Sequence, residues 1–310
     1  MVEGGVKRRR LKSAVDWRFR VAAHWLASGP SGHHIRYVFQ RAQGSQPAPD
    51  WVFADMVERA RRHASVLGPQ RGKLLELGAG FDFAAALTLW GLGYRQQVLV
   101  DIRRLARVGL VNNICSRLRH LGLEAPGPIE TFDDLQRYGI EYRVPFDARD
   151  TGIPDDSFHH IVSTNVLEHI PARDIPAVLS ECRRIVSGDG TVSMQIDCQD
   201  HWSYQDPSLD RFNFRRYNDR TWRLFNPPSL YQNRLTPSEH SSLFKSAGFQ
   251  IYSCELMVPE GAGRTSELEN ARPKPAPLRR DMATRTRAVN PSANPARGSV
   301  WQGVSAPPPG

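Results

Sequence analysis

This chain of 310 residues has few cysteines, no long apolar run and no charge excess in its middle. Its four cysteines, Cys115, Cys182, Cys198 and Cys254, include no Cys-x-x-Cys pair, which argues against a disulfide framework or a thiolate zinc site. No apolar run approaches the roughly 20 residues of a membrane-spanning helix. These absences predict a cytoplasmic protein without a transmembrane segment.

The formal net charge of +9 belongs to the two ends of the chain. Residues 1–20 carry seven Lys or Arg against two acidic residues, and residues 260–310 carry eight against four. Residues 21–259 hold 26 charged residues of each sign. Because this central part is neutral, it does not indicate a basic face for nucleic acid.

Glycine is missing at one informative position. Residues 73–77 predict a strand that leads into Gly78, Ala79 and Gly80, but Phe83 stands where a dinucleotide-binding loop has its third glycine. No Gly-Lys-Ser or Gly-Lys-Thr follows, so the phosphate-loop pattern is absent too. The turn therefore suits a cofactor without a phosphate chain.

From residue 72 onward, short apolar runs alternate with helical patterns. The predicted strands are 73–77, 97–100, 141–144, 159–163, 191–196 and 249–258, and the predicted helices are 83–91, 105–121, 175–186 and 236–247. This alternation predicts an α/β fold in which a mostly parallel sheet has helices on both faces. Ligands bind such sheets at the carboxyl ends of the strands.

We divide the chain into three parts. Residues 1–71 form a helical N-terminal preface or lid, and residues 72–258 form the main domain, with an insertion at 199–234 that packs over the site. Residues 259–310 contain eight prolines in their last 51 positions and almost no periodic apolar signal. We expect this tail to be disordered.

Several ordered segments resemble the class I S-adenosylmethionine-dependent methyltransferases. They are Glu76 to Gly80, Asp101, Pro145 to Ala148, 153–158 and 161–170. The resemblance implies a Rossmann-like sheet with an antiparallel C-terminal edge, methyltransferase activity and S-adenosylmethionine as cofactor. Residues 249–258 supply one closing strand, and residues 300–304 are the candidate for the other.

A narrower resemblance covers residues 35–43 and 199–249. It is to a bacterial subgroup associated with polysaccharide or secondary-metabolite pathways. The resemblance implies a polar, hydroxylated acceptor, either a glycan or a small molecule.

The expected cofactor site lies at the carboxyl ends of the strands. Asp101 stands 23 positions after Gly78, where its carboxylate can accept both ribose hydroxyls, although it could also cap a helix. Asp147 could accept the adenine amino group, or could be a turn residue. The full expected set is Glu76, Gly78, Ala79, Gly80, Asp101, Ile102, Asp147, Ala148, Asn165 and Val166.

His201 follows the fifth strand and is the first candidate for a general base, since a neutral imidazole can take a hydroxyl proton near physiological pH. His169 is the second candidate, and could instead brace a helix. The amide-rich and aromatic segment beyond His201 is expected to bind the acceptor through Trp202, Tyr204, Asn213, Tyr231, Asn233 and Arg234. Asp197, Asp200 and His201 could be metal ligands, but their mixed spacing leads us to expect no metal.

The sequence therefore predicts an enzyme that methylates a hydroxyl oxygen of a sugar-containing or small metabolite. A catalytically inactive, methyltransferase-like binding or partner subunit is the alternative. An enzyme acting on nucleic acid, held by the basic tails, ranks last because the central part is neutral.

Overall fold

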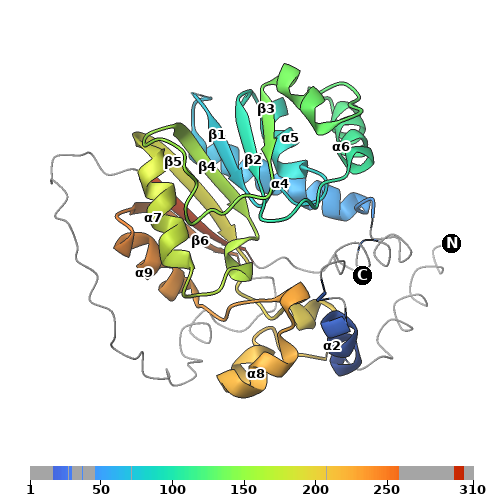
Figure 1. The fold of residues 1–310 in the computed structure, drawn as a ribbon, viewed down its shortest axis with the longest axis vertical. Coiled ribbons are helices and arrows are strands. Elements are labelled where there is room, and N and C mark those ends of the chain that lie inside the picture. Colours follow the sequence, from blue (N-terminus) through green and yellow to red (C-terminus); the bar gives the residue numbers. More distant parts are fainter. Residues whose placement is uncertain are drawn as a thin grey trace.

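The computed structural model describes residues 17–26, 28–29, 37, 46–70, 72–206, 208–257 and 297–303. At its centre lies a seven-stranded sheet in the order β3-β2-β1-β4-β5-β7-β6 (Figure 1). The strands are β1 (Leu74–Leu77), β2 (Gln97–Val100), β3 (Ile140–Arg143), β4 (Phe158–Thr164), β5 (Val186–Ile196), β6 (Gln250–Met257) and β7 (Arg297–Gly303).

Helices cover both faces of the sheet. One face packs against α4 (Asp50–Leu67), α5 (Ala84–Gly91) and α6 (Val108–His120), and the other against α7 (Ile175–Ile185) and α9 (Pro237–Ser246). Two further helices, α2 (Trp17–Leu26) and α8 (Asp219–Phe225), lie together below the sheet in Figure 1. Short 3₁₀ helices are η1 (Phe132–Tyr138), η2 (Leu167–His169), η3 (His201–Tyr204), η4 (Asn213–Arg216) and η5 (Pro228–Leu230).

The strand order reverses beside β1. This strand pairs with β2 on one side and with β4 on the other, both in parallel. The helices that follow β1 and β4 consequently lie on opposite faces, which opens a crevice at the carboxyl ends of these strands. The predicted glycine turn follows β1, and Asn165 follows β4, so both reach this crevice.

Alternation along β1 decides where its side chains go. Leu75 and Leu77 belong to the core beneath α7 and α9, whereas Leu74 belongs to the core beneath α4 and α5. Glu76 shares the face of Leu74, so its carboxylate is directed into the α4 and α5 layer.

The mostly parallel sheet with helices on both faces is confirmed, but the antiparallel C-terminal edge was wrong. β7 lies between β5 and β6 and runs parallel to both, with Arg297 opposite Thr191 and Gln250. A tight hairpin would force antiparallel pairing, whereas 39 residues separate β6 from β7. A connection of this length can return the chain to the other end of the sheet.

The tail expected to be disordered, residues 259–310, contains β7; its other residues lie outside the described part. Of the preface, residues 1–71, the described part comprises α2, α4 and the short stretches around them.

The helix α2 packs on the insertion expected at residues 199–234. Trp17 and Val21 form one buried cluster with Trp202, Phe214 and Trp222, and the rings of Trp17 and Trp202 lie 5.8 Å apart. Figure 1 shows α2 and α8 side by side, although about 200 residues separate them in sequence. Helix α2 and the insertion therefore form one small apolar unit near the end of β5.

Candidate active site

The turn after β1 has the backbone geometry that its glycines permit. Gly78 and Gly80 have φ angles of 80° and 70°, values that side-chain-bearing residues rarely adopt. The backbone amides of Gly78 and Ala79 both donate to the carbonyl oxygen of Val100, at 2.9 and 3.1 Å. These bonds fix the turn against the end of β2.

Asp101 closes this turn from β2. Its Oδ2 accepts from the amide of Gly80 at 3.2 Å, and its Oδ1 accepts from the amide of Arg103 at 3.1 Å. The next helix, α6, begins only at Val108, so Asp101 is not its cap. Burial raises the pKa of the Asp101 carboxyl despite these hydrogen bonds. A polar ligand at the crevice would meet a carboxylate held in place by the turn.

Glu76 lies under the same turn. Its side chain is 3% exposed, and Oε2 has no hydrogen-bond partner among the described residues. Burial, together with the carboxylates of Asp82 and Asp101, raises the pKa of Glu76 to about 8. An orphaned buried oxygen of this kind is costly, and a hydrogen-bond donor on a bound cofactor would satisfy it.

The other expected cofactor residues have different surroundings. Ile102 is 65% exposed, and Ala148 is partly buried against the core under α7. The exposed carboxylate of Asp147 pairs with Arg149 at 2.7 Å, and this hydrogen-bonded pair lowers the pKa of Asp147. Both carboxylate oxygens of Asp147, expected to accept from the adenine amino group, thus already bond to Arg149.

Asn165 ends β4 in a left-handed conformation, with a φ of 56°, which asparagine tolerates better than most residues. Its amide donates to the carbonyl oxygen of Gln195, and its Oδ1 accepts from Arg59 at 3.3 Å. Arg59 is buried on α4. The bend directs the next residue, Val166, towards Gly78, so the loops after β1 and β4 are in contact.

His201 lies at the end of β5, as expected, with a carboxylate behind it. Its Nε2 stands 3.4 Å from Oδ2 of Asp197, which also accepts from the hydroxyl of Tyr204 at 2.6 Å. Burial alone would raise the pKa of Asp197, but the contacts from His201 and Tyr204 outweigh it and hold this pKa below its usual range. A charged Asp197 therefore lies against the Nε2 side of the His201 ring.

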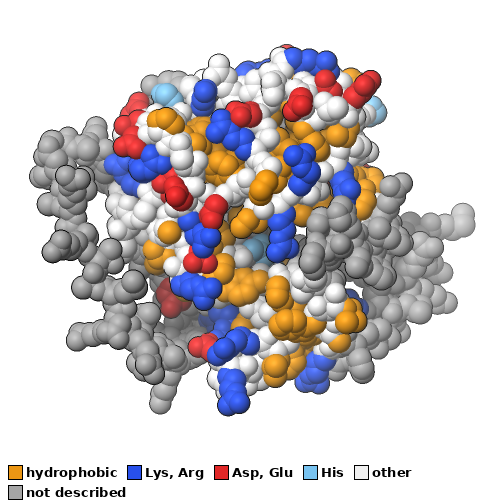
Figure 2. All heavy atoms as spheres, in the orientation of Figure 1, with side chains coloured by type: hydrophobic (Ala, Val, Ile, Leu, Met, Phe, Trp, Pro, Cys, Tyr) orange, Lys and Arg blue, Asp and Glu red, His pale blue; other side chains and the backbone are white. Residues whose placement is uncertain are grey.

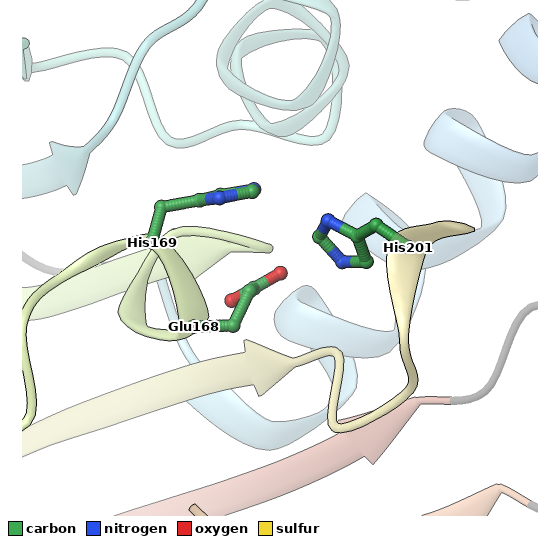
Figure 3. A group of neighbouring side chains, drawn as sticks. All are labelled: Glu168, His169 and His201. Atoms are coloured by element: carbon green, nitrogen blue, oxygen red, sulfur yellow. The ribbon is translucent and has the colours of Figure 1, made fainter. Parts of the chain in front are cut away.

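His169 comes close to His201 from the loop after β4. The two rings lie 5.0 Å apart, and Nδ1 of His169 lies 2.7 Å from the carbonyl oxygen of Tyr231. Figure 3 shows both rings and the carboxylate of Glu168 directed towards one region. The two candidate bases therefore belong to one group of side chains.

Glu168 is the least expected member of that group. Its side chain is 1% exposed, and neither carboxylate oxygen has a hydrogen-bond partner among the described residues. Burial, and then the charge of Asp197, raises the pKa of Glu168 well above its usual range. Figure 2 shows histidine atoms set back in a hollow between the sheet and the smaller apolar part below it.

The expected acceptor residues divide into two groups. Trp202, Asn213, Asn233 and Arg234 bond to the protein itself, through Phe225, Asp200, Leu167 and Phe214 respectively. The Tyr204 side chain lies beside His201 and bonds to Asp197, whereas Tyr231 contacts His169 only through its main-chain carbonyl. Of the six expected acceptor residues, Tyr204 is thus the one whose side chain the structure places next to a candidate base.

Sequence reasoning missed the roles of Asp197, Glu168 and Arg59. Asp197 had been considered only as a metal ligand, and Glu168 only as part of a family-like segment. Glu168 could have been noticed in the sequence, because it is a charged residue inside the apolar run from Val166 to Ile170. No sequence signal indicated the role of Arg59, because its partner Asn165 is 106 positions away.

Comparison with known proteins concerns the domain and not its individual site residues. The family model for a methyltransferase domain matches residues 127–194, which run from before β3 to within β5. No curated protein matches the chain significantly. Together, the sheet order, the glycine turn and the matched segment define a Rossmann-like methyltransferase domain. The matched segment is that of a methyltransferase domain, and S-adenosylmethionine is the cofactor that it indicates.

Solved structures with a similar fold share little sequence with the chain. The [4+2]-cyclase SpnF has 14% identity and a TM-score of 0.40, over 62% of this chain and 56% of that one. Phosphoethanolamine N-methyltransferase 2 of Haemonchus contortus, bound to S-adenosyl-L-methionine, has 14% identity and a TM-score of 0.38, over 62% and 36%. Geranyl diphosphate methyltransferase has 17% identity and a TM-score of 0.31, over 47% and 54%. The chain thus spans about half or less of each of these proteins.

Within the described ranges, no helix combines the length and apolar character that crossing a membrane would demand.

Proposed function

We propose that this protein transfers a methyl group from S-adenosylmethionine to a hydroxyl oxygen of a sugar-containing or small-metabolite acceptor. The observation that carries the proposal is the turn formed by Gly78 and Gly80, whose geometry is fixed by the carboxylate of Asp101. Near this turn, the unsatisfied Oε2 of Glu76 is suited to a cofactor with hydrogen-bond donors.

Residues on three loops would hold the cofactor. Asp101 is placed to accept hydrogen bonds from ribose hydroxyls, and the Gly78 to Gly80 backbone lets the methionine part approach closely. Asn165 and Val166 bound the same crevice from β4. When bound, S-adenosylmethionine supplies a methyl group whose bond to the sulfonium sulfur breaks as the acceptor oxygen bonds to the methyl carbon.

His201 is the residue best placed to take the hydroxyl proton. Because Nε2 faces Asp197, the lone pair of the neutral ring lies on Nδ1, and Nδ1 accepts the proton. The charge of Asp197 then stabilises the imidazolium, as a carboxylate does for a histidine base in other enzymes. His169 is the second candidate base, although its bond to Tyr231 also lets it brace the loop.

The acceptor is proposed on the chemistry around the site. Tyr204 offers a hydroxyl group beside His201, where it bonds to Asp197, and this suits a polar acceptor with several oxygens. We further propose a reducing compartment such as the cytoplasm, because all four cysteines are free. An incomplete C-terminal end of the sheet would favour the alternative, an inactive partner subunit, but β7 fills that end.

Calorimetric titration tests the proposed cofactor site. We expect wild-type protein to bind S-adenosylmethionine saturably, Asp101→Ala to abolish measurable binding, and Asp133→Ala, which alters an exposed carboxylate on η1, to bind normally. Equal affinities for wild type and Asp101→Ala would refute the site. Transfer of labelled methyl groups to a panel of sugars and hydroxylated metabolites then tests activity. Cofactor binding without any methylated product would favour the inactive alternative.

A further inference from the structure

We propose that Glu168, His169 and His201 form a binding site for one divalent transition-metal ion. The three residues come from two loops, η2 after β4 and η3 after β5. One potential ligand atom from each residue lies within 4.8 Å of the other two. In Figure 3 the carboxylate and both rings converge on a common region.

The burial of Glu168 is the independent observation in favour of a ligand. A fully buried carboxylate with no hydrogen bond among the described residues is rare in proteins, because it forfeits its solvation without replacement. The negative charge of Asp197 lies nearby and adds to this cost. A bound cation would remove both problems, since it would coordinate Glu168 and offset the two carboxylate charges.

The two histidines are held as metal-binding histidines usually are. A carbonyl oxygen can only accept, so Nδ1 of His169 donates to Tyr231, and the lone pair of the neutral ring lies on Nε2. Likewise, Nε2 of His201 faces Asp197, and the lone pair lies on Nδ1. A carboxylate or carbonyl that fixes the tautomer of a histidine ligand is the common second contact in metal sites.

The donor set also indicates which metal fits. Two imidazoles and one carboxylate suit zinc, iron, cobalt or nickel, whereas magnesium prefers oxygen ligands alone. Ligand atoms bonded at 2.0–2.1 Å to one tetrahedral zinc ion stand about 3.4 Å apart. The separations here, up to 4.8 Å, exceed that value by up to about 1.4 Å, so side-chain rotations would have to bring the three ligand atoms closer when an ion binds.

Asp200, considered as a ligand from the sequence, does not belong to this site. Its two carboxylate oxygens accept from the amide of Trp202 and from the side chain of Asn213. Asp197 lies behind His201 and contacts it through Nε2. The site thus has three protein ligands, which leaves positions open for other oxygen atoms.

The open positions give the ion a role that rests on the proposed function. The site lies beside the crevice proposed for the cofactor, so an acceptor hydroxyl could occupy an open position. A hydroxyl bound to a divalent ion is more acidic than a free one. When an ion is bound, His201 is one of its ligands and does not act as the general base. The ion then takes over the task of making the acceptor hydroxyl more acidic. Substitution of His201 lowers turnover in either case, so metal binding itself must be measured.

The test uses the full chain after treatment with a chelator. Co²⁺ is titrated by absorbance, and Zn²⁺ by competition with a chromophoric chelator. We expect one tight equivalent in wild type, a loss of affinity of about 100-fold or more in Glu168→Gln and in His201→Asn, and no change in Glu130→Gln or His120→Asn. Glu130 and His120 are exposed, so these controls measure adventitious binding.

Wild-type affinity equal to that of Glu168→Gln and His201→Asn would overturn the proposal. Binding of S-adenosylhomocysteine, measured on every variant, reports whether each one folds, and His201→Asn remains informative if Glu168→Gln does not fold. The same measurement separates the two proposals. Cofactor binding without a metal equivalent rejects only the metal site, whereas a metal equivalent without cofactor binding rejects only the proposed function.

Discussion

Gly78 and Val166 are packed so closely that a Cβ atom on Gly78 would lie 2.2 Å from Cγ2 of Val166. This contact joins the loop after β1 to the loop after β4, the two loops that bound the cofactor crevice. Gly78 therefore has two separate reasons to be glycine: its φ of 80° and the lack of room for a side chain.

Gly78→Ala should destabilise the protein more than Gly122→Ala. Gly122 has a similar φ of 76°, but a Cβ there would meet nothing within 4 Å, so its substitution reports backbone strain of about 1–2 kcal/mol. Gly78→Ala adds overpacking, typically about 1–3 kcal/mol. Urea denaturation measures both, and Val166→Ala should recover part of the Gly78→Ala loss. Equal losses for the two glycine variants would show that the contact with Val166 is relaxed.

Asp197→Asn should lower turnover by about 100-fold or more while cofactor affinity changes little. The amide cannot stabilise a protonated His201, so the rate of the variant should also depend differently on pH. Rates across a pH series, alongside the exposed control Asp133→Asn, measure this effect. A rate equal to wild type across the series would remove Asp197 from the mechanism.

Glu76→Gln should stabilise the cofactor-free protein at alkaline pH. The pKa of Glu76 is about 8 in the folded state, against 4.5 for the free side chain, so the unfolded chain releases the proton first. The stabilisation from protonated Glu76 is present below pH 4.5 and is lost as the pH rises to about 8. At about 1.4 kcal/mol per pKa unit, the gain at pH 9 is at most about 5 kcal/mol.

Urea denaturation at pH 5 and pH 9 measures this gain, with the exposed Glu130→Gln as the control. We expect Glu76→Gln to differ from wild type mainly at pH 9. At pH 9, where Glu76 is ionised, the same variant should bind S-adenosylmethionine more weakly, because an amide has one accepting oxygen and the carboxylate has two. A stability difference that is identical at both pH values would contradict the raised pKa.

His63 should make the protein sensitive to acid. It is buried between Ser193 and Thr164, at 2.7 and 3.1 Å, and burial, followed by the charge of Arg59, lowers its pKa to about 3. Between pH 6.5 and 3 the unfolded chain binds a proton that the folded chain does not, so stability falls as the pH falls.

One such histidine contributes a slope of up to about 1.4 kcal/mol per pH unit in this range. Unfolding free energies of His63→Gln between pH 4 and 6.5 should therefore vary less with pH than those of wild type. Part of the slope should remain, because burial also lowers the pKa of His240 to about 4. The exposed His120→Gln should keep the full slope. An unchanged slope in His63→Gln would mean that His63 is protonated in the folded protein.

Trp17→Ala should loosen the unit formed by α2 and the insertion. Trp17 is buried against Trp202 and Phe225, with ring centroids 5.8 and 4.9 Å away, whereas Trp51 is 56% exposed. Loss of a buried aromatic ring typically costs about 3–5 kcal/mol. Limited proteolysis should cut Trp17→Ala faster than Trp51→Ala within residues 199–234. Equal rates would show that α2 does not hold the insertion.

Local patterns in the sequence were enough to predict most elements of the sheet. The strand at 97–100 was predicted residue for residue, and the helix predicted at 236–247 is α9 (Pro237–Ser246), which begins with a capping box of Thr236 and Glu239. Such signals depend on neighbours within a few positions. The candidate bases were also found in this way, since His201 follows directly after an apolar strand.

Properties that depend on distant partners could not be predicted. The direction of β7 depends on pairing with β5 and β6, not on its own residues. Trp202 was expected to line the acceptor pocket, but an aromatic residue looks the same in sequence whether it packs on Trp17 or on a ligand. The surroundings of Glu168 come from two loops that only the fold brings together.

The placement of β7 also sets an order of events during synthesis. In the sheet, β6 is joined to β5 only through β7, yet β7 follows β6 in the chain by 39 residues. Until the ribosome has made β7, the edge of β5 has no partner strand, and β6 has no strand of the sheet to pair with. Exposed strand edges attract other chains. A nascent chain of this protein is therefore at its greatest risk of mispairing between the synthesis of residue 257 and that of residue 303.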